Sequence, residues 1–248
     1  MTAWRAHSLG DGRTELALPR LEAHLVVRLS DGPIVLGEAE DTLTSHGHAV
    51  VLVGRQRAWR RRLPSGPHES VGLELAPWQL EAVLGVSAGE LAGAHHPLSE
   101  LLPDAARLRE QLLEAPPARR AAVLQTWALE RSRRGREAPA LIGPSFAALA
   151  RGEGVREVVA RTGLSHRHFG RIFQRWCGLL PHEVSQLARF RRAVLALSAG
   201  ARDLVFVALD AGYADQAHLT RELRARAGLT PAQLRAAAPF EPGHLPSR

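Results

Sequence analysis

The sequence predicts an α+β protein in which a small N-terminal β-sandwich or barrel with helices precedes an all-α domain of two helix–turn–helix motifs joined by a long helix. Three observations support this prediction. The first 75 residues contain short β-branched runs separated by Gly, Asp and Pro, a pattern typical of strands and turns. From residue 76 onward, apolar residues recur at helical spacing. Within the helical part, one short pattern is written twice, about fifty residues apart.

Composition limits the class of protein. A chain of 248 residues is long enough for two domains, each with its own core, and a hydrophobic content of 45% is ordinary for a globular protein. No apolar run approaches the roughly 20 residues of a membrane helix, and the N-terminus lacks the apolar segment of a signal peptide. The single cysteine, Cys177, has no partner for an internal disulfide. We therefore expect a cytoplasmic protein without a membrane partner.

Positive charge is concentrated where the repeat lies. The net charge is +7, yet residues 1–115 contain 11 Arg against 15 acidic residues, whereas residues 141–235 contain 14 Arg against 7 acidic residues. This distribution is expected when a phosphate-binding domain is attached to a non-binding one, although a solvated Arg-rich surface is the simpler alternative. We expect four parts: an N-terminal domain, a helical basic linker, the domain with the repeat and a C-terminal tail, at residues 1–115, 116–138, 139–240 and 241–248.

The N-terminal domain is expected to begin with strands and to continue with short helices. Strands are predicted within residues 24–32, 48–54 and 71–76, and turns at Ser30–Pro33, His46–His48 and Pro64–Pro67. A helix is predicted at 77–85, because Pro77 suits a helix start and Gly85 suits a helix end. A second helix follows over 104–115, where leucines recur on one face.

Two features of the N-terminal domain could be chemical sites. His46 and His48, with His68 and Glu69 downstream, have a spacing at which imidazoles on one strand can share a metal. Gly47 and the surrounding residues favour a loop instead, so we interpret these histidines as exposed or hydrogen-bonded and predict no metal and no cofactor. The Arg-rich run at 55–62 could bind an anionic ligand or the DNA backbone, but a solvated strand-and-turn face is favoured.

An amphipathic helix is predicted at 117–136, after the Pro116-Pro117 pair, and it ends in a run of arginines. Such a helix could dimerise, pack on the preceding domain or reach DNA phosphates. Domain packing followed by a charged linker is the favoured interpretation, and both a monomer and a homodimer stay open.

The repeat predicts two helix–turn–helix units, at Val155–Pro181 and Val205–Pro231. Gly163 corresponds to Gly212 at an offset of 49 residues, and Phe169 corresponds to Leu219 at an offset of 50, so the second turn contains one extra residue. Each glycine suits the left-handed end of a first helix. Ser165 and Asp215 are good N-caps for the second helices, and a helix at Pro181–Gly200 joins the two units.

The pair of motifs resembles the DNA-binding domain of AraC/XylS-type transcription regulators over roughly residues 139 to 240. The stretch Ala208–Pro231 follows the family signature most closely, with Leu219 and Leu223 where the family usually has Phe. The stretch Val71–Ala92 is similar to a sensor-like domain found ahead of such motifs, which implies a regulatory N-terminal domain. The resemblance implies a bacterial, sequence-specific, double-stranded DNA-binding regulator, with RNA polymerase and an unidentified small-molecule effector as candidate partners.

The second helix of each unit is expected to enter a major groove with its N-terminal residues on base edges. Their polar faces supply the candidate DNA-binding residues: Arg167, Arg171, Gln174, Gln216, Ala217, His218, Thr220 and Arg221. Arg171 and Arg221 are the leading candidates, because Arg can bridge guanine O6 and N7; pairing of either with an acid such as Glu222 is the alternative. Ala217 could contact a thymine methyl group, whereas Gly170 weakens the first helix as a reader.

Other functions are considered beside this one. A metal-binding sensor or enzyme on the N-terminal half would need a reactive group, but the sequence has no nucleophile elbow, phosphate loop or paired catalytic carboxylates, and Cys177 is interpreted as buried packing. We therefore expect no enzyme and no catalytic residue. A non-specific DNA-binding protein is the remaining alternative, and it would show salt-dependent binding without a large specific-to-random ratio.

Overall fold

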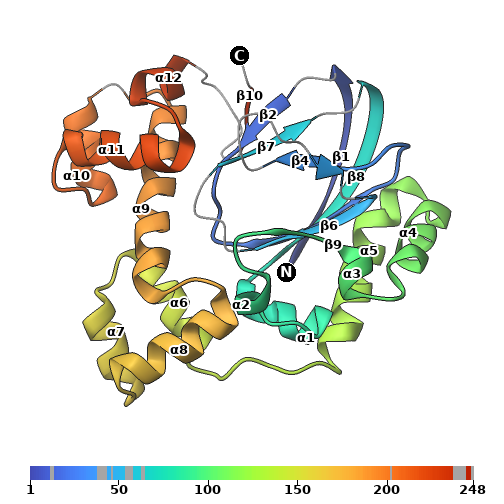
Figure 1. The fold of residues 1–248 in the computed structure, drawn as a ribbon, viewed down its shortest axis with the longest axis horizontal. Coiled ribbons are helices and arrows are strands. Elements are labelled where there is room, and N and C mark those ends of the chain that lie inside the picture. Colours follow the sequence, from blue (N-terminus) through green and yellow to red (C-terminus); the bar gives the residue numbers. More distant parts are fainter. Residues whose placement is uncertain are drawn as a thin grey trace.

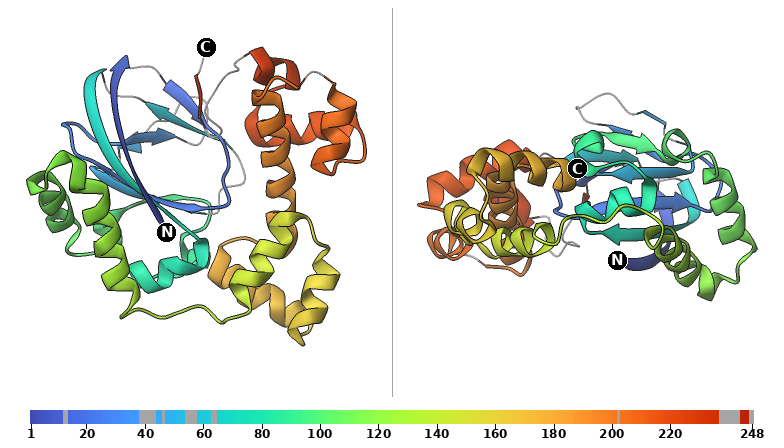
Figure 2. Two further views of the ribbon diagram at one scale, coloured as in Figure 1. Left: turned by 180° about the vertical axis from the view of Figure 1, so that it is seen from behind. Right: turned by 90° about the horizontal axis from the view of Figure 1, so that it is seen from below.

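The computed structural model describes residues 1–11, 14–37, 44–45, 47–53, 58–62, 65–201, 203–236 and 244–246. Two antiparallel sheets and several short helices form the N-terminal part, and helices alone form the C-terminal part (Figure 1). Figure 2 shows from two further sides that these parts lie next to each other along the long axis. The predicted α+β class, with a β-sandwich before an all-α domain, is confirmed.

The described strands form two five-stranded sheets. The first has the order β1-β8-β3-β6-β9, with strands at Thr2–Asp11, Ser65–Leu75, Ala23–Arg28, Ala49–Leu52 and His95–Pro97. The second has the order β10-β2-β7-β4-β5, with strands at His244–Pro246, Thr14–Ala17, Trp59–Arg62, Val35–Gly37 and Thr44–Ser45.

The first sheet is the middle layer of the N-terminal part, because its strands bury both faces. Leu25 and Val27 of β3 pack into the core shared with the helices, whereas Val26 between them packs against the core shared with the second sheet. In β6, Val51 faces the helices and Val50 faces the second sheet. Successive side chains of a strand point to opposite faces, so these nearly continuous apolar runs fit a strand covered on both sides.

One predicted turn differs from the sequence-based expectation. Residues 30–32 are bends and the described residues 47–48 form a turn, as predicted, but residues 65–67 belong to β8, where they pair with the end of β1. The long ladder between β1 and β8 outweighs the local Gly and Pro preference for a turn. The expected C-terminal tail supplies β10, which pairs with β2 of the second sheet.

The helices of the N-terminal part cover the other face of the first sheet (Figure 1). They are η1 (Pro77–Gln79), α1 (Leu80–Leu84), α2 (Ala88–Leu91), α3 (Leu98–Leu101), α4 (Ala105–Glu114), η2 (Pro117–Arg119) and α5 (Arg120–Ser132). Gly85 ends α1 in the left-handed conformation, as predicted, with φ 78°. Within the range expected as a linker, α5 buries Leu124 and Ala128 in the same core as the sheet, so the domain-packing interpretation holds for this helix.

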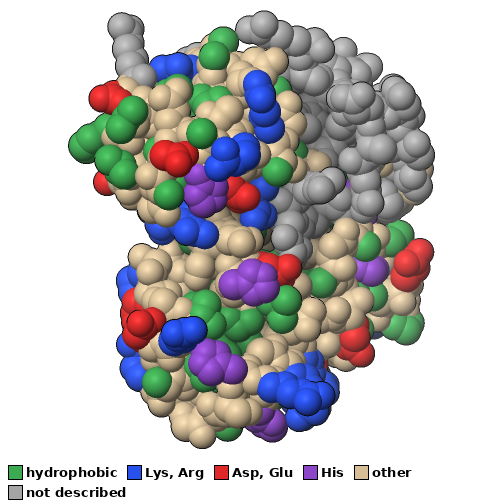
Figure 3. All heavy atoms as spheres, turned by 60° about the vertical axis from the view of Figure 1, so that its left-hand side comes forward, with side chains coloured by type: hydrophobic (Ala, Val, Ile, Leu, Met, Phe, Trp, Pro, Cys, Tyr) green, Lys and Arg blue, Asp and Glu red, His purple; other side chains and the backbone are tan. Residues whose placement is uncertain are grey.

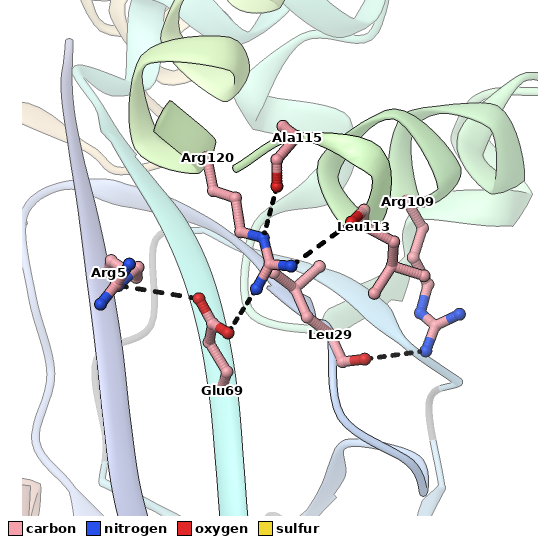
Figure 4. Close-up of polar contacts among 7 residues, drawn as sticks. All are labelled: Arg5, Leu29, Glu69, Arg109, Leu113, Ala115 and Arg120. Carbon is pink, nitrogen blue, oxygen red and sulfur yellow. Dashed lines mark hydrogen bonds and ion pairs between the residues drawn. The ribbon is translucent and has the colours of Figure 1, made fainter. Parts of the chain in front are cut away.

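Polar contacts tie α4 and α5 to the sheet (Figure 4). The Glu69 carboxylate of β8 accepts a hydrogen bond from Arg120 Nη1 at 2.5 Å and lies 3.7 Å from Arg5 Nε of β1. Arg109 of α4 donates to the carbonyl oxygens of Arg28 and Leu29, at 3.1 and 3.2 Å. Ion pairs therefore occupy Glu69, one of the residues considered as a metal ligand, and anchor the helical layer.

The C-terminal part is organised around one long helix, α9 (Pro181–Ser198). One helical group contains α6 (Ile142–Arg151), α7 (Val155–Thr162) and α8 (His166–Cys177), and the other contains α10 (Leu204–Ala211), α11 (Gln216–Ala227) and α12 (Pro231–Ala236). Figure 1 shows the two groups at opposite ends of α9. Their apolar residues form one continuous core, which Leu18 and Leu21 of the N-terminal part also enter. Among the described helices, none combines the length and the hydropathy that a membrane span requires.

Candidate nucleic-acid interface

The first helix–turn–helix unit consists of α7 and α8, joined by the turn at Gly163. Gly163 adopts φ 70° at the end of α7, a left-handed conformation in which a side chain would be strained. Ser165 then begins α8, because its Oγ accepts a hydrogen bond from the His168 backbone N–H at 3.3 Å. Phe169 and Phe173 lie fully buried on one face, with ring centroids 5.3 Å apart. The predicted turn, cap and buried face are confirmed.

The second unit, α10 and α11, repeats this geometry with one added residue. The helices correspond at offsets of 49 and 50, so the extra residue lies in the turn. Asp215 Oδ1 accepts the His218 backbone N–H at 2.6 Å and caps α11, while Leu219 and Leu223 are fully buried in place of the phenylalanines. Both predicted caps form, and the residues that follow each cap, 166–167 and 216–217, are exposed.

The longer turn of the second unit is closed by Tyr213, which is only 3% exposed. Burial raises the pKa of its phenol to about 12, so the ring stays neutral at physiological pH. The ring of His218 meets it edge-on at 5.1 Å between centroids. His218 is half-buried by this contact, which leaves less of its ring for a partner than the sequence pattern implies.

The predicted DNA-binding side chains lie on the outward faces of α8 and α11. Most are exposed, and His218 and Thr220 are half-buried; the exposed ones are Arg167, Arg171, Gln174, Gln216, Ala217 and Arg221. Arg171 Nη2 lies 3.3 Å from His168 Nδ1. Thr220 Oγ1 donates to the Gln216 carbonyl oxygen at 2.9 Å, a contact within the helix.

The expected alternative for Arg221, a pair with Glu222, does not form. The Glu222 carboxylate instead accepts from Arg226 Nε at 2.9 Å, and Arg226 also donates to Gln186 Oε1 of α9 at 3.1 Å. Within the described part of the chain, Arg221 forms no ion pair. Its guanidinium is therefore available to a partner, whereas Arg226 has a structural role that the sequence did not reveal.

Two arginines of α9, Arg189 and Arg192, donate hydrogen bonds to carbonyl groups at helix ends. Arg192 donates to the carbonyl oxygens of Ala150, in the last turn of α6, and Ala211, in the last turn of α10, at 3.2 and 3.1 Å. Arg189 donates to the Gly212 carbonyl oxygen at 3.3 Å. Cations at helix C-termini satisfy free carbonyl groups and complement the helix dipole. Since α9 has 18 residues, it is a spacer about 27 Å long, fixed to both units.

The surface over these units carries many cations. Figure 3 shows Arg and His side chains on both helical groups, on the face where they come forward. The excess of Arg over acidic residues in this part of the sequence produces a positive potential, which attracts a polyanion. Apolar side chains are also exposed on α10, where Val205, Phe206 and Leu209 are 54%, 69% and 60% accessible.

The N-terminal part holds the far end of α8. A Cβ on Gly89 of α2 would lie 2.9 Å from Arg175 Cα, and one on Gly178 would lie 2.8 Å from the Ala88 carbonyl oxygen. Glycine at both positions therefore permits direct backbone packing of α2 on α8. Arg175 Nη2 also donates to Glu81 Oε1 of α1 at 3.1 Å.

The N-terminal part also contacts α9 and α11. Arg191 of α9 donates to Glu22 Oε1 at 2.6 Å, and this guanidinium counteracts burial to hold the pKa of the Glu22 carboxyl below its usual value. The Ala58 backbone N–H donates to the Arg226 carbonyl oxygen at 2.6 Å. The orientation of both units is thus coupled to the N-terminal part.

The other candidate sites lie partly outside the described residues. His46 and residues 55–57 of the Arg-rich run lie outside the described residues, and Trp59–Arg62 of that run form β7. Among the described residues, no group of three His, Cys, Asp or Glu side chains is placed to hold a metal. Cys177 is fully buried, and burial raises the pKa of its thiol, so it stays protonated. The interpretation of Cys177 as core packing is confirmed.

Comparisons with known proteins agree with this geometry. Residues 158–237 match the family model described as "Helix-turn-helix domain", which is of the AraC/XylS type. The chain is similar to a 1.65 Å structure of ToxT from Vibrio cholerae, with a TM-score of 0.51 and 10% identity over 95% of this chain and 98% of that chain. ToxT bound to (E)-4-(8-methylnaphthalen-1-yl)but-3-enoic acid matches with a TM-score of 0.50 and 10% identity, over 95% and 97% of the two chains. At this low identity, the structural similarity shows a shared fold alone. No match was found among curated proteins.

Proposed function

We infer that this protein, whose C-terminal region is an AraC/XylS-type helix–turn–helix domain, is a sequence-specific DNA-binding transcription regulator. One observation carries the inference: α8 and α11 are both capped at their N-termini, exposed along their polar faces and attached to the same rigid α9. A helix of this kind reads the major groove with its first turns.

We propose that α8 and α11 occupy successive major grooves on one face of the duplex, about 34 Å apart along the DNA axis. The operator would then be non-palindromic and about two helical turns long. Arg171 and Arg221 would contact guanine or phosphate, and Arg167, Gln174, Gln216 and Thr220 would surround them. The exposed methyl group of Ala217 suits contact with a thymine methyl group. His218 would contact DNA through the part of its ring that Tyr213 does not cover.

The N-terminal part, which contacts both units, is proposed to regulate the DNA-binding domain in response to a small molecule. Residues 1–115 remain our proposed regulatory domain and residues 139–240 the proposed DNA-binding domain. RNA polymerase is a proposed partner, and the protein would bind this two-turn site as a monomer or as one protomer of a homodimer. A protein with these partners acts in the bacterial cytoplasm.

Selection of bound duplexes from a random DNA pool tests the function. The full chain should enrich one asymmetric sequence, and footprinting on that sequence should protect two helical turns. The double variant Arg171→Ala/Arg221→Ala is the matched control, because both side chains are exposed and their removal should therefore leave the fold intact. Protection of a single turn would contradict tandem reading, and binding that depends on salt without enrichment would favour the non-specific alternative.

A further inference from the structure

A cavity of about 690 Å³ lies in the N-terminal part beside the segment that leads to the DNA-binding domain. Its walls come from α1, α4, α5 and residues 134–136. The volume is within the range of small-molecule sites, roughly 300–1,000 Å³. Four arginines line it, together with three acidic residues and an aromatic side chain: Arg107, Arg131, Arg134, Arg136, Glu81, Asp104, Glu130 and Trp127.

The charged groups of this cavity divide into engaged and free ones. Arg131 is fixed in place, because its Nε donates to the Val83 carbonyl oxygen at 2.7 Å, its Nη1 lies 3.6 Å from Asp104 Oδ2 and its guanidinium stacks over Trp127 at 5.4 Å. By contrast, the guanidiniums of Arg107 and Arg134 make no hydrogen bond or ion pair with any described residue. Two cations thus face the cavity without a partner, beside a half-buried indole.

The acidic groups that line the cavity do not neutralise all of its arginines. Asp104 is paired with Arg131, and Glu81 lies 3.5 Å from Arg136 Nη1 and 3.1 Å from Arg175 Nη2. Glu130 is the one acid lining the cavity that makes no ion pair with a described residue, against two free arginines. Guanidinium groups bind carboxylate and phosphate through paired, charge-assisted hydrogen bonds, and an indole face suits an aromatic body.

We propose that this cavity binds a small organic anion, with a carboxylate or phosphate held by Arg107 and Arg134 and an aromatic body packed on Trp127. This proposal rests on the proposed regulatory function. It assigns a binding site and a chemical class to the small-molecule effector.

Packing contacts and ion pairs connect the cavity lining to α8, the first proposed reading helix. A Cβ on Gly135 would lie 2.0 Å from the Ala82 carbonyl oxygen, so the backbone of residues 134–136 packs directly against α1. Its neighbour Arg136 shares the Glu81 carboxylate with Arg175 of α8. An anion that draws Arg136 toward the cavity changes the charge balance at Glu81, and therefore the attachment of α8.

Calorimetric titration of the full chain at constant ionic strength tests the site, with benzoate, phenyl phosphate and inorganic phosphate as probes. We expect saturable binding of phenyl phosphate or benzoate, and weaker binding of inorganic phosphate, which lacks the aromatic body. Arg107→Gln/Arg134→Gln should weaken binding at least about tenfold. Arg133→Gln is the matched control, because Arg133 is exposed in the same segment but does not line the cavity; it should keep the affinity within about twofold.

Two results overturn the inference: no saturable binding of any probe to the wild-type protein, or equal weakening by the double variant and by Arg133→Gln. DNA selection without a probe is run in parallel on the same preparation. Specific DNA binding without probe binding removes the effector site and keeps the proposed function. Probe binding without specific DNA binding keeps the site and removes the proposed function.

Discussion

Replacement of Arg221 by alanine tests whether this side chain contacts a base or only the phosphate backbone of DNA. Arg221 is exposed on α11 and pairs with no acidic group in the described part of the chain, since Glu222 is engaged by Arg226. Its removal should therefore change the free energy of unfolding by no more than about 0.5 kcal/mol. Any larger effect on DNA affinity reports a lost contact rather than a damaged fold.

The size of the effect distinguishes the two kinds of contact. A bidentate contact with guanine contributes about 1–3 kcal/mol of discrimination, which corresponds to a roughly 5-fold to 150-fold weaker Kd at the cognate site. Loss of a phosphate contact alone would weaken all sequences to a similar degree and would reduce the slope of log K against log salt by about 1.

The measurement is a set of dissociation constants for the selected duplex and a scrambled duplex at three salt concentrations. We expect Arg221→Ala to lose affinity mainly for the selected duplex. Arg133→Ala, which removes the same charge outside the helix–turn–helix units, is the control and should change both duplexes little. Unchanged affinity of Arg221→Ala for both duplexes would refute the assignment of Arg221 to the reading face.

Three further predictions concern the stability of the scaffold, each measured by urea unfolding. Asp215→Ala should lower the free energy of unfolding by about 1 kcal/mol because the cap on the His218 N–H is lost; Asp215→Asn should recover most of it, and an equal loss in both variants would exclude capping. Phe173→Ala should lower the free energy of unfolding by about 3–5 kcal/mol at this fully buried position, whereas Phe173→Leu should lower it by less than about 1.5 kcal/mol; equal losses in the two variants would contradict a cavity cost at this position. Burial of His24, then the Arg20 charge, lowers its pKa to about 4 although Glu74 Oε1 lies 3.9 Å from its Nδ1. The unfolded chain then binds a proton between about pH 6.5 and 4 that the folded chain does not, so stability should fall by on the order of 3 kcal/mol as pH decreases through this window; a pH slope unaltered in His24→Leu would contradict it.

Local signals were sufficient for the helix–turn–helix units. Gly163 and Gly212 end their helices because a left-handed residue is required there, and Ser165 and Asp215 cap the next helices through hydrogen bonds to residues three positions later. These interactions join neighbours in the chain, so the residue types and their spacing determine them. The same holds for the apolar faces of α8 and α11 and for the exposure of most predicted reading side chains, but not for the half-burial of His218 against Tyr213.

Long-range contacts were not predictable in this way. Nothing in the local sequence distinguishes Arg192, which joins the ends of α6 and α10, from Arg191, which reaches Glu22 across the molecule. The Glu81 contact with Arg175 spans 94 positions, and β10 joins a sheet whose other strands come from the N-terminal part. A long arginine side chain has many acceptors within reach, and only the packing of distant elements selects one. The sequence by itself thus determined the two capped helices that we propose to read DNA, whereas the tertiary structure decided how the N-terminal part contacts them and where the proposed effector site lies.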